Sequence, residues 1–206
     1  MLFGVQNVRK NFEQTEVLKD VSLAVNKGDV VVILGPSGSG KTTFLRCLNF
    51  LERADGGTMD FHGTQLSLAE ASDREIADVR KKTAFVFQNY NLFANKTALE
   101  NVTLGLTVGR GIAKDEAHEI AMEALRRVGM EARADYYPAQ LSGGQQQRVG
   151  IARALALEPK ILVCDEATSA LDVSVQETIV ELLVRIQRER NLTILFICHD
   201  LALVSR

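Results

Sequence analysis

One glycine-rich segment, GPSGSGKT at residues 35–42, constrains the fold of this chain more than any other feature. It follows the apolar run at residues 30–34 and has the spacing G-x-x-x-x-G-K-[ST], which is typical of a phosphate-binding loop between a strand and a helix. Glycines let successive backbone N–H groups face an anion, and the N-terminal end of the helix adds a favourable field. In such a loop Lys41 reaches the outer phosphates of a nucleotide, and the Thr42 hydroxyl holds Mg²⁺.

Composition restricts the function classes further. A length of 206 residues with 46% hydrophobic content suits one domain, or one domain with an inserted lobe. The net charge of −2 gives no electrostatic footprint for nucleic acid, so we expect no such partner. The apolar runs are too short to span a bilayer and residues 1–10 do not resemble a signal peptide, so a membrane role requires a partner. Cys47, Cys164 and Cys198 lie in apolar runs, which favours buried thiols over a redox or metal site.

The segments around the loop alternate between strand-like and helical patterns. Residues 2–8 and 17–25 are predicted as strands, residues 58–66 as a short strand pair, and residues 43–52 and 72–81 as helices. A buried strand at residues 83–87 ends at Gln88, a place where ligand contacts concentrate in α/β sheets. Phe12 is expected in the loop between the first two strands, where its ring could stack on a base or pack the hairpin.

A helical insertion is expected over residues 89–139, with helices at 99–106 and 114–130 and no strand between them. The sequence LSGGQ at 141–145 follows, before a helix at 146–157. Ser142 stands at an N-cap position, and Gly143 and Gly144 allow close backbone approach. This is either a second anion-binding helix start or an ordinary capped helix. One nucleotide cannot easily touch both this motif and the phosphate loop within one chain, because the insertion separates them.

Two further apolar runs end in polar residues. In ILVCDE at residues 161–166, Asp165 suits Mg²⁺ binding and Glu166 suits activation of a water, although an acidic pair before a helix is the alternative. A helix is predicted at residues 173–190 and a buried strand at 193–198. This strand ends at His199, which is either structural or a contact to the γ-phosphate.

Six motifs in this order resemble the nucleotide-binding subunit of an ABC transporter over the whole chain: GPSGSGKTT, FVFQ, LSGGQ, ILVCDE, SALD and ICHD. The resemblance implies an α/β fold with a P-loop NTPase (RecA-like) core, an antiparallel β subdomain and an inserted α-helical subdomain. Residues 1–88 and 160–206 would form the catalytic core lobe, and residues from about 89 to 159 the helical lobe. Family members continue past the histidine with a helix and more strands, whereas this sequence stops at Arg206, so a C-terminally short cassette is expected, either truncated or unusual.

The resemblance also implies roles for individual residues, with ATP and Mg²⁺ as cofactors. Glu166 would be the catalytic base, His199 would hold the γ-phosphate, and Phe12 would stack on adenine, where the family more often has Tyr. Gln88 would sense Mg²⁺ and couple to the transmembrane partner. The nucleotide would be held by Gly35, Pro36, Ser37, Gly38, Ser39, Gly40, Lys41, Thr42 and Thr43, and the metal by Thr42, Gln88 and Asp165. In a head-to-tail dimer with Asp172 at the contact, the opposite subunit would add Ser142, Gly143, Gly144 and Gln145.

The implied activity is ATP hydrolysis that energises a membrane importer, from the cytoplasmic face of the membrane. Its partners would be a second ATPase subunit, transmembrane permease subunits and, indirectly, a solute-binding protein. The first two-thirds of the chain resembles importers of polar amino acids, whereas from Val163 onward it is more similar to importers of oligopeptides, with Ala167 in place of the former's usual Pro. Amino-acid import is the prediction, and oligopeptide import is an alternative. A soluble ABC ATPase without a membrane partner and a fragment that only binds nucleotide are two further hypotheses.

Overall fold

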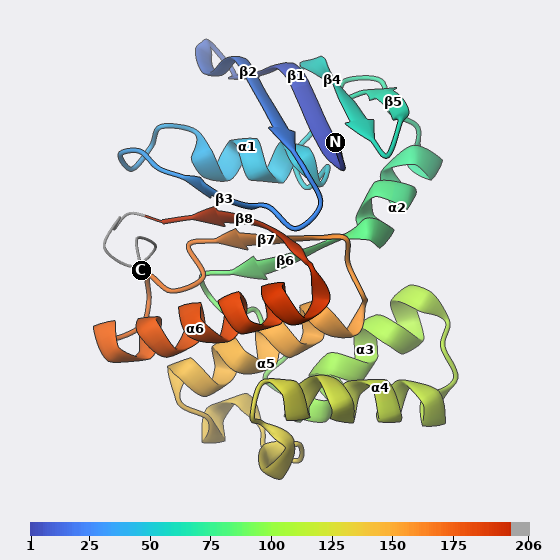
Figure 1. The fold of residues 1–206 in the computed structure, drawn as a ribbon, viewed down its shortest axis with the longest axis vertical. Helices are drawn as coiled ribbons and strands as arrows, with labels where there is room; N and C mark the ends of the chain where they lie inside the picture. The colour runs from blue at the N-terminus through green and yellow to red at the C-terminus, as the bar shows by residue number, and fades with distance from the viewer. Residues whose placement is uncertain (199–206) are drawn as a thin grey trace.

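Two four-stranded sheets form the frame of the molecule, which we describe from a computed structural model for residues 1–198 (Figure 1). The antiparallel sheet has the order β2-β1-β4-β5, and the parallel sheet has the order β3-β8-β7-β6. The strands are β1 (Phe3–Phe12), β2 (Thr15–Val25), β3 (Val30–Ile33), β4 (Gly56–Phe61), β5 (Thr64–Ser67), β6 (Thr83–Phe87), β7 (Ile161–Asp165) and β8 (Thr193–Ile197). The helices are α1 (Lys41–Leu48), α2 (Asp73–Lys82), α3 (Ala98–Arg110), α4 (Lys114–Arg127), α5 (Gly143–Ala156) and α6 (Val173–Arg190), with short 3-10 helices η1 (Glu131–Arg133) and η2 (Pro138–Gln140).

The parallel sheet is covered on both faces, which explains why its strands are continuous apolar runs. Successive side chains of a strand point to opposite faces. In β7, Ile161 and Val163 accordingly pack in one core with α1 and the antiparallel sheet, whereas Leu162 and Cys164 pack in a second core with α5 and α6. Figure 1 shows α1 between the two sheets and α5 and α6 on the far side of the parallel sheet.

The helices α3 and α4 lie within the insertion expected at residues 89–139, and α5 follows it. These three helices contact one another, and α5 in turn contacts β6 and α6. Small side chains let α4 approach its neighbours, since Ala117, Ala121 and Ala124 lie on its buried face. The buried residues of the insertion belong to the same core as the lower face of the parallel sheet. No helix within residues 1–198 is long and apolar enough to cross a membrane.

Several element boundaries differ from those expected by a few residues, and two of these differences bear on the site. Phe12 does not lie in a loop, because the pairing of β1 with β2 continues through Asn11–Glu16 to Phe12–Thr15 and makes it the last residue of a strand. The helix expected at residues 43–52 begins at Lys41, directly after the left-handed Gly40, and ends at Leu48, two residues before the left-handed Phe50. The start at Lys41 places its side chain in the first helical turn, beside the loop.

Candidate nucleotide-binding site

The ends of the parallel strands bring three of the expected residues to one edge of the sheet. Phe87 and Ile197 are the register partners of Asp165 on the two sides of β7. Gln88 and Glu166, the next residues along the chain, therefore leave neighbouring strands at the same edge. His199 follows β8, but it lies outside the described residues.

The phosphate loop connects β3 to α1 at this same edge. Gly40 is left-handed, with φ of 87°, and a Cβ there would come within 3.1 Å of the Val17 carbonyl oxygen, so only glycine fits without strain. Lys41 is 8% exposed, and its ammonium group donates hydrogen bonds of 2.8 Å to the carbonyl oxygens of Gly35 and Pro36. The lysine head group thus lies against the curl of the loop.

Two of the three side chains expected to hold Mg²⁺, those of Thr42 and Asp165, are adjacent. The Thr42 hydroxyl donates a hydrogen bond of 2.8 Å to Oδ1 of Asp165, across 123 positions of sequence. Burial raises the pKa of Asp165, while this hydrogen bond and the charges of Arg46 and Lys41 act in the opposite direction. Mg²⁺ prefers oxygen ligands and usually takes few from the protein and the rest from water and phosphates. A hydroxyl and a carboxylate placed together beside a phosphate loop fit that requirement.

Glu166 has an unusual backbone conformation. Its φ of 50° is left-handed, which is uncommon for a residue other than glycine and is concentrated at functional sites. The turn is held from its far side, because both the amide and the hydroxyl of Ser169 donate hydrogen bonds to the Glu166 carbonyl oxygen, at 3.0 and 2.9 Å. The side chain therefore leaves the edge of the sheet from a turn with a defined shape.

The LSGGQ motif opens α5 with Ser142 as the N-cap, as predicted. The Ser142 hydroxyl accepts from the Gln145 amide, and the Gln145 side chain accepts from the Ser142 amide, in a reciprocal capping box. A Cβ on Gly143 would lie 2.7 Å from the Tyr90 hydroxyl, so any larger residue here would have to displace the Tyr90 side chain. Because α5 and α1 lie on opposite faces of the parallel sheet, one chain does not form a single pocket from both motifs (Figure 1).

Phe12 is available for contact with a ligand. Its ring is 44% exposed at the tip of the β1–β2 hairpin, and the Lys10 ammonium group lies 5.0 Å from the ring centroid. This exposure argues against the alternative in which the Phe12 ring packs inside the hairpin.

Comparison with known proteins agrees with this geometry. The family described as "ABC transporter" matches residues 18–169. The chain belongs to the ABC transporter family. It is 46% identical over 205 residues to the L-cystine import ATP-binding protein TcyN of Bacillus subtilis, covering 100% of this chain and 79% of that protein. It is 48% identical over 201 residues to the probable amino-acid import ATP-binding protein YxeO of the same organism, covering 98% and 80%.

Solved structures show the same cassette fold. The chain is similar to the ATP-binding cassette MJ0796, in a dimeric post-hydrolysis state bound to ADP and Pi, with a TM-score of 0.85, 38% identity, and coverage of 98% of this chain and 89% of that one. It is also similar to cbiO1 from Clostridium perfringens, with a TM-score of 0.88, 32% identity, and coverage of 98% and 80%. The predicted family, P-loop NTPase fold and ATPase class are thereby confirmed.

Sequence reasoning missed two residues of α5 whose side chains bond to backbone carbonyl groups near Gln88. Arg153 on α5 donates hydrogen bonds to the carbonyl oxygens of Tyr90 and Asn91, at 3.0 and 2.6 Å. Both of those residues are left-handed, with φ of 54° and 50°, so the arginine holds a bent stretch of backbone. Gln147, on the same helix, is fully buried. The only sequence signal was a polar residue among the apolar positions of a helix, which does not reveal its partner.

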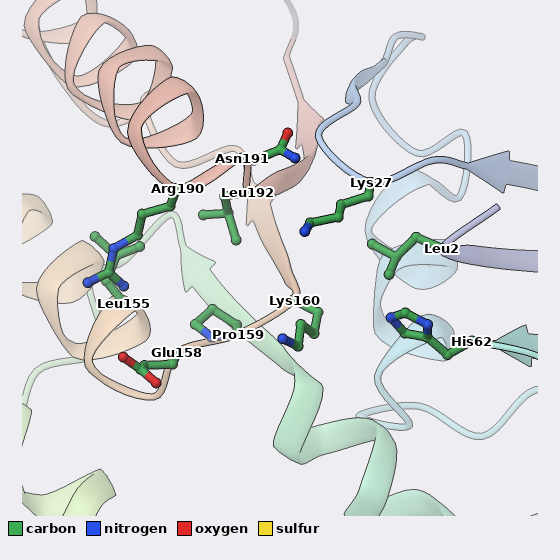
Figure 2. Close-up of a pocket in the computed structure, with 10 residues that line it drawn as sticks. All are labelled: Leu2, Lys27, His62, Leu155, Glu158, Pro159, Lys160, Arg190, Asn191 and Leu192. Atoms are coloured by element: carbon green, nitrogen blue, oxygen red, sulfur yellow. The ribbon is translucent and has the colours of Figure 1, made fainter.

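A separate cavity of about 480 Å³ lies at the opposite end of the parallel strands (Figure 2). Lys27 and Lys160, from the segments before β3 and β7, extend into it (Figure 2). None of the expected site residues lines this cavity, because they follow the C-terminal ends of the strands whereas the cavity lies at the N-terminal ends.

Proposed function

We propose that this cassette binds Mg²⁺-ATP between two head-to-tail copies and hydrolyses it to drive a membrane importer of amino acids. The observation that carries the proposal is the hydrogen bond between Thr42 and Asp165, which joins the phosphate loop to the end of β7 beside Glu166. The relatives that are named for import of cystine and of amino acids support the class of solute.

Each residue has a defined task in this proposal. Backbone amides of residues 35–43 and the Lys41 ammonium group bind the phosphates, and Thr42, Asp165 and Gln88 hold the metal ion. Mg²⁺, when bound, neutralises charge that develops on the phosphoryl oxygens. Glu166 orients and deprotonates the attacking water, and His199 contacts the γ-phosphate. The exposed ring of Phe12 stacks on adenine.

The second copy completes the site. Ser142 to Gln145 open a helix whose N-terminal end favours an anion, yet they lie on the other face of the sheet from the phosphate loop of the same chain. A head-to-tail dimer would place this helix start against the nucleotide of the opposite copy. A similar cassette has been solved as a dimer bound to ADP and Pi, which supports the pairing of two copies.

A groove beside the loop after Gln88 supports contact with a permease. The groove has a volume of about 510 Å³, and its lining includes Phe85, Phe87, Leu51 and Phe93. Leu51 and Phe93 are 48% and 50% exposed, and neighbouring exposed apolar side chains mark interaction sites. A cytoplasmic segment of a permease would bind here and hold the cassette at the cytoplasmic face of the membrane, with a solute-binding protein acting on the other side.

The substitution Glu166→Gln tests the hydrolytic part. We expect turnover to fall roughly 10²- to 10⁴-fold while ATP binding is retained, because the amide keeps the shape of the side chain and cannot accept the proton. Glu181→Gln, on an exposed position of α6, is the matched control and should leave turnover unchanged. Near-normal turnover in Glu166→Gln would remove Glu166 from the role of base.

The transport part has its own test. The cassette, expressed in its own cells and solubilised gently, should co-purify with a multi-span membrane protein. A catalytically active cassette that retains no such protein would favour a soluble ABC ATPase instead.

A further inference from the structure

Gln147 lies on α5, two residues after the LSGGQ motif, and contacts both segments that carry the proposed hydrolytic residues. It is 0% exposed. Its side-chain amide donates a hydrogen bond of 2.6 Å to the carbonyl oxygen of Ala167 and a longer one of 3.4 Å to that of Phe87. Ala167 follows Glu166, and Phe87 precedes Gln88. One buried amide therefore joins the signature helix to two neighbouring strand ends.

The other half of this amide is not satisfied. Within residues 1–198, Oε1 of Gln147 is the one buried side-chain polar atom that has no hydrogen-bond partner. Since both partners of the side chain are carbonyl oxygens, the nitrogen must face them, and rotating the amide would not help. A buried acceptor without a donor destabilises a fold, and such groups in native proteins call for an explanation. An apolar side chain of equal length would avoid this cost, so stability alone does not explain a glutamine here.

The backbone that Gln147 holds is the unusual turn at Glu166. Ser169 donates to the carbonyl group of this left-handed residue, and Gln147 donates to the next carbonyl group along the chain, that of Ala167. A residue kept in a sparsely populated conformation requires such support from its surroundings.

We propose that Gln147 is a positioning residue that sets Glu166 and Gln88 relative to the LSGGQ helix of the same chain. The inference rests on the proposed function, in which that helix binds the nucleotide of the opposite copy. A shift of α5 on closure against one nucleotide would then be transmitted, through a single amide, to the residues that act on the other. Gln147 itself touches neither nucleotide.

The variant Gln147→Met tests this role in the full chain. Methionine keeps the length and the apolar stem, removes both hydrogen bonds, and removes the unsatisfied oxygen. We expect kcat for ATP to fall at least about tenfold, as small misplacements of catalytic groups do. KM for ATP should stay within about twofold, and Tm within about 3 °C, since lost bonds and relieved desolvation offset each other. Gln147→Glu, whose carboxylate cannot donate to a carbonyl group, should lower kcat as well.

Gln187→Met is the matched control. The side-chain amide of Gln187 also donates a hydrogen bond to a distant carbonyl oxygen, that of Gly28, at 2.7 Å. This bond lies at the opposite end of the parallel sheet. The kcat of Gln187→Met should equal that of the wild type.

A normal kcat in Gln147→Met overturns the inference. So does a loss of activity that merely follows a fall in Tm, with kcat per folded molecule unchanged. The wild-type chain is assayed beside Glu166→Gln. If the wild-type chain itself hydrolyses no ATP, the proposed function is wrong, and this inference is wrong with it.

Discussion

At the scale of single residues, the Lys41 side chain both stabilises the phosphate loop and carries a charge without an ion-pair partner in the described part of the chain. Its ammonium group is buried and bonded to two loop carbonyl groups, so it stabilises the curl of the loop. Among residues 1–198 no carboxylate lies within ion-pairing distance of it. A buried cation without an ion pair is costly unless an anion compensates it. In the proposed function, the phosphate groups of the nucleotide would supply this anion.

Cys47 and Cys164 illustrate the opposite case, groups kept neutral by burial. Burial raises the pKa of Cys47 from 9.0 to about 11, and it also raises the pKa of Cys164. The protonated thiol favours folding, so this contribution to stability is present below pH 9 and is lost as the pH rises through about 11.

We therefore expect native Cys47 and Cys164 to resist iodoacetamide at pH 8, where about one Cys47 thiol in a thousand is ionised. Reaction in the folded protein should begin only toward pH 11, whereas both thiols should react at once in denaturant. Mass spectrometry of the modified peptides provides the measurement. Rapid native labelling at pH 8 would contradict the burial described here.

At the scale of elements, Asn101 connects α3 to the segment that leads into it. It is fully buried, accepts a hydrogen bond from the Phe93 amide at 2.7 Å, and donates to the carbonyl oxygens of Phe93, Lys96 and Thr97. Without this side chain the Phe93 amide and the Lys96 carbonyl group would lose these bonds, whereas the carbonyl groups of Phe93 and Thr97 would keep their bonds from the amides of Lys96 and Asn101. The amide thus orders the start of the helical insertion.

Asn101→Leu keeps the volume and removes all of these bonds, so we expect the free energy of unfolding to fall by about 2 to 4 kcal/mol. Urea unfolding followed by circular dichroism measures it. Val108→Ala, 77% exposed on the same helix, serves as the control and should change stability by less than about 0.5 kcal/mol. If the free energy of unfolding falls as little in Asn101→Leu as in the control, water must replace the hydrogen bonds that the Asn101 side chain makes.

Most elements were predictable, and the exceptions have physical causes. The strands that end at Phe87 and Asp165 were found because buried parallel strands are short apolar runs followed by polar residues. The extension of β1 to Phe12 was missed, because pairing across a hairpin depends on the partner strand and not on local pattern. Gln147 and Arg153 were missed for a related reason: their partners are carbonyl groups distant in sequence, which no spacing reveals.

At the scale of the whole molecule, α5 is the helix that connects the residues proposed for nucleotide binding, hydrolysis and permease contact. Its first turn is the LSGGQ motif, Gln147 contacts the segments of Gln88 and Glu166, and Arg153 lies in the groove proposed for a permease. One rigid helix would therefore relate the partner's nucleotide, the chain's own hydrolytic residues and the membrane protein.

The head-to-tail arrangement makes a prediction for mixtures of two inactive chains. Lys41→Ala damages the phosphate loop, and Ser142→Arg blocks the LSGGQ helix start, so each variant alone should form dimers in which both sites are defective. In a mixed dimer one site combines both defects, while the other pairs an intact loop with an intact LSGGQ motif. After co-refolding or exchange at equal amounts, half of the dimers are mixed and each holds one intact site, so ATP hydrolysis should recover to about a quarter of the wild-type rate if the sites act independently. Each variant mixed with itself is the control. A tagged pull-down would show whether mixed dimers form. If they form and activity does not recover, either the loop and the motif are not shared between copies, or hydrolysis requires both sites.

A chain that carries both substitutions, mixed with wild type, separates these two cases. The mixed dimer has no intact site if loop and motif are shared, but it has one intact site if each chain acts alone.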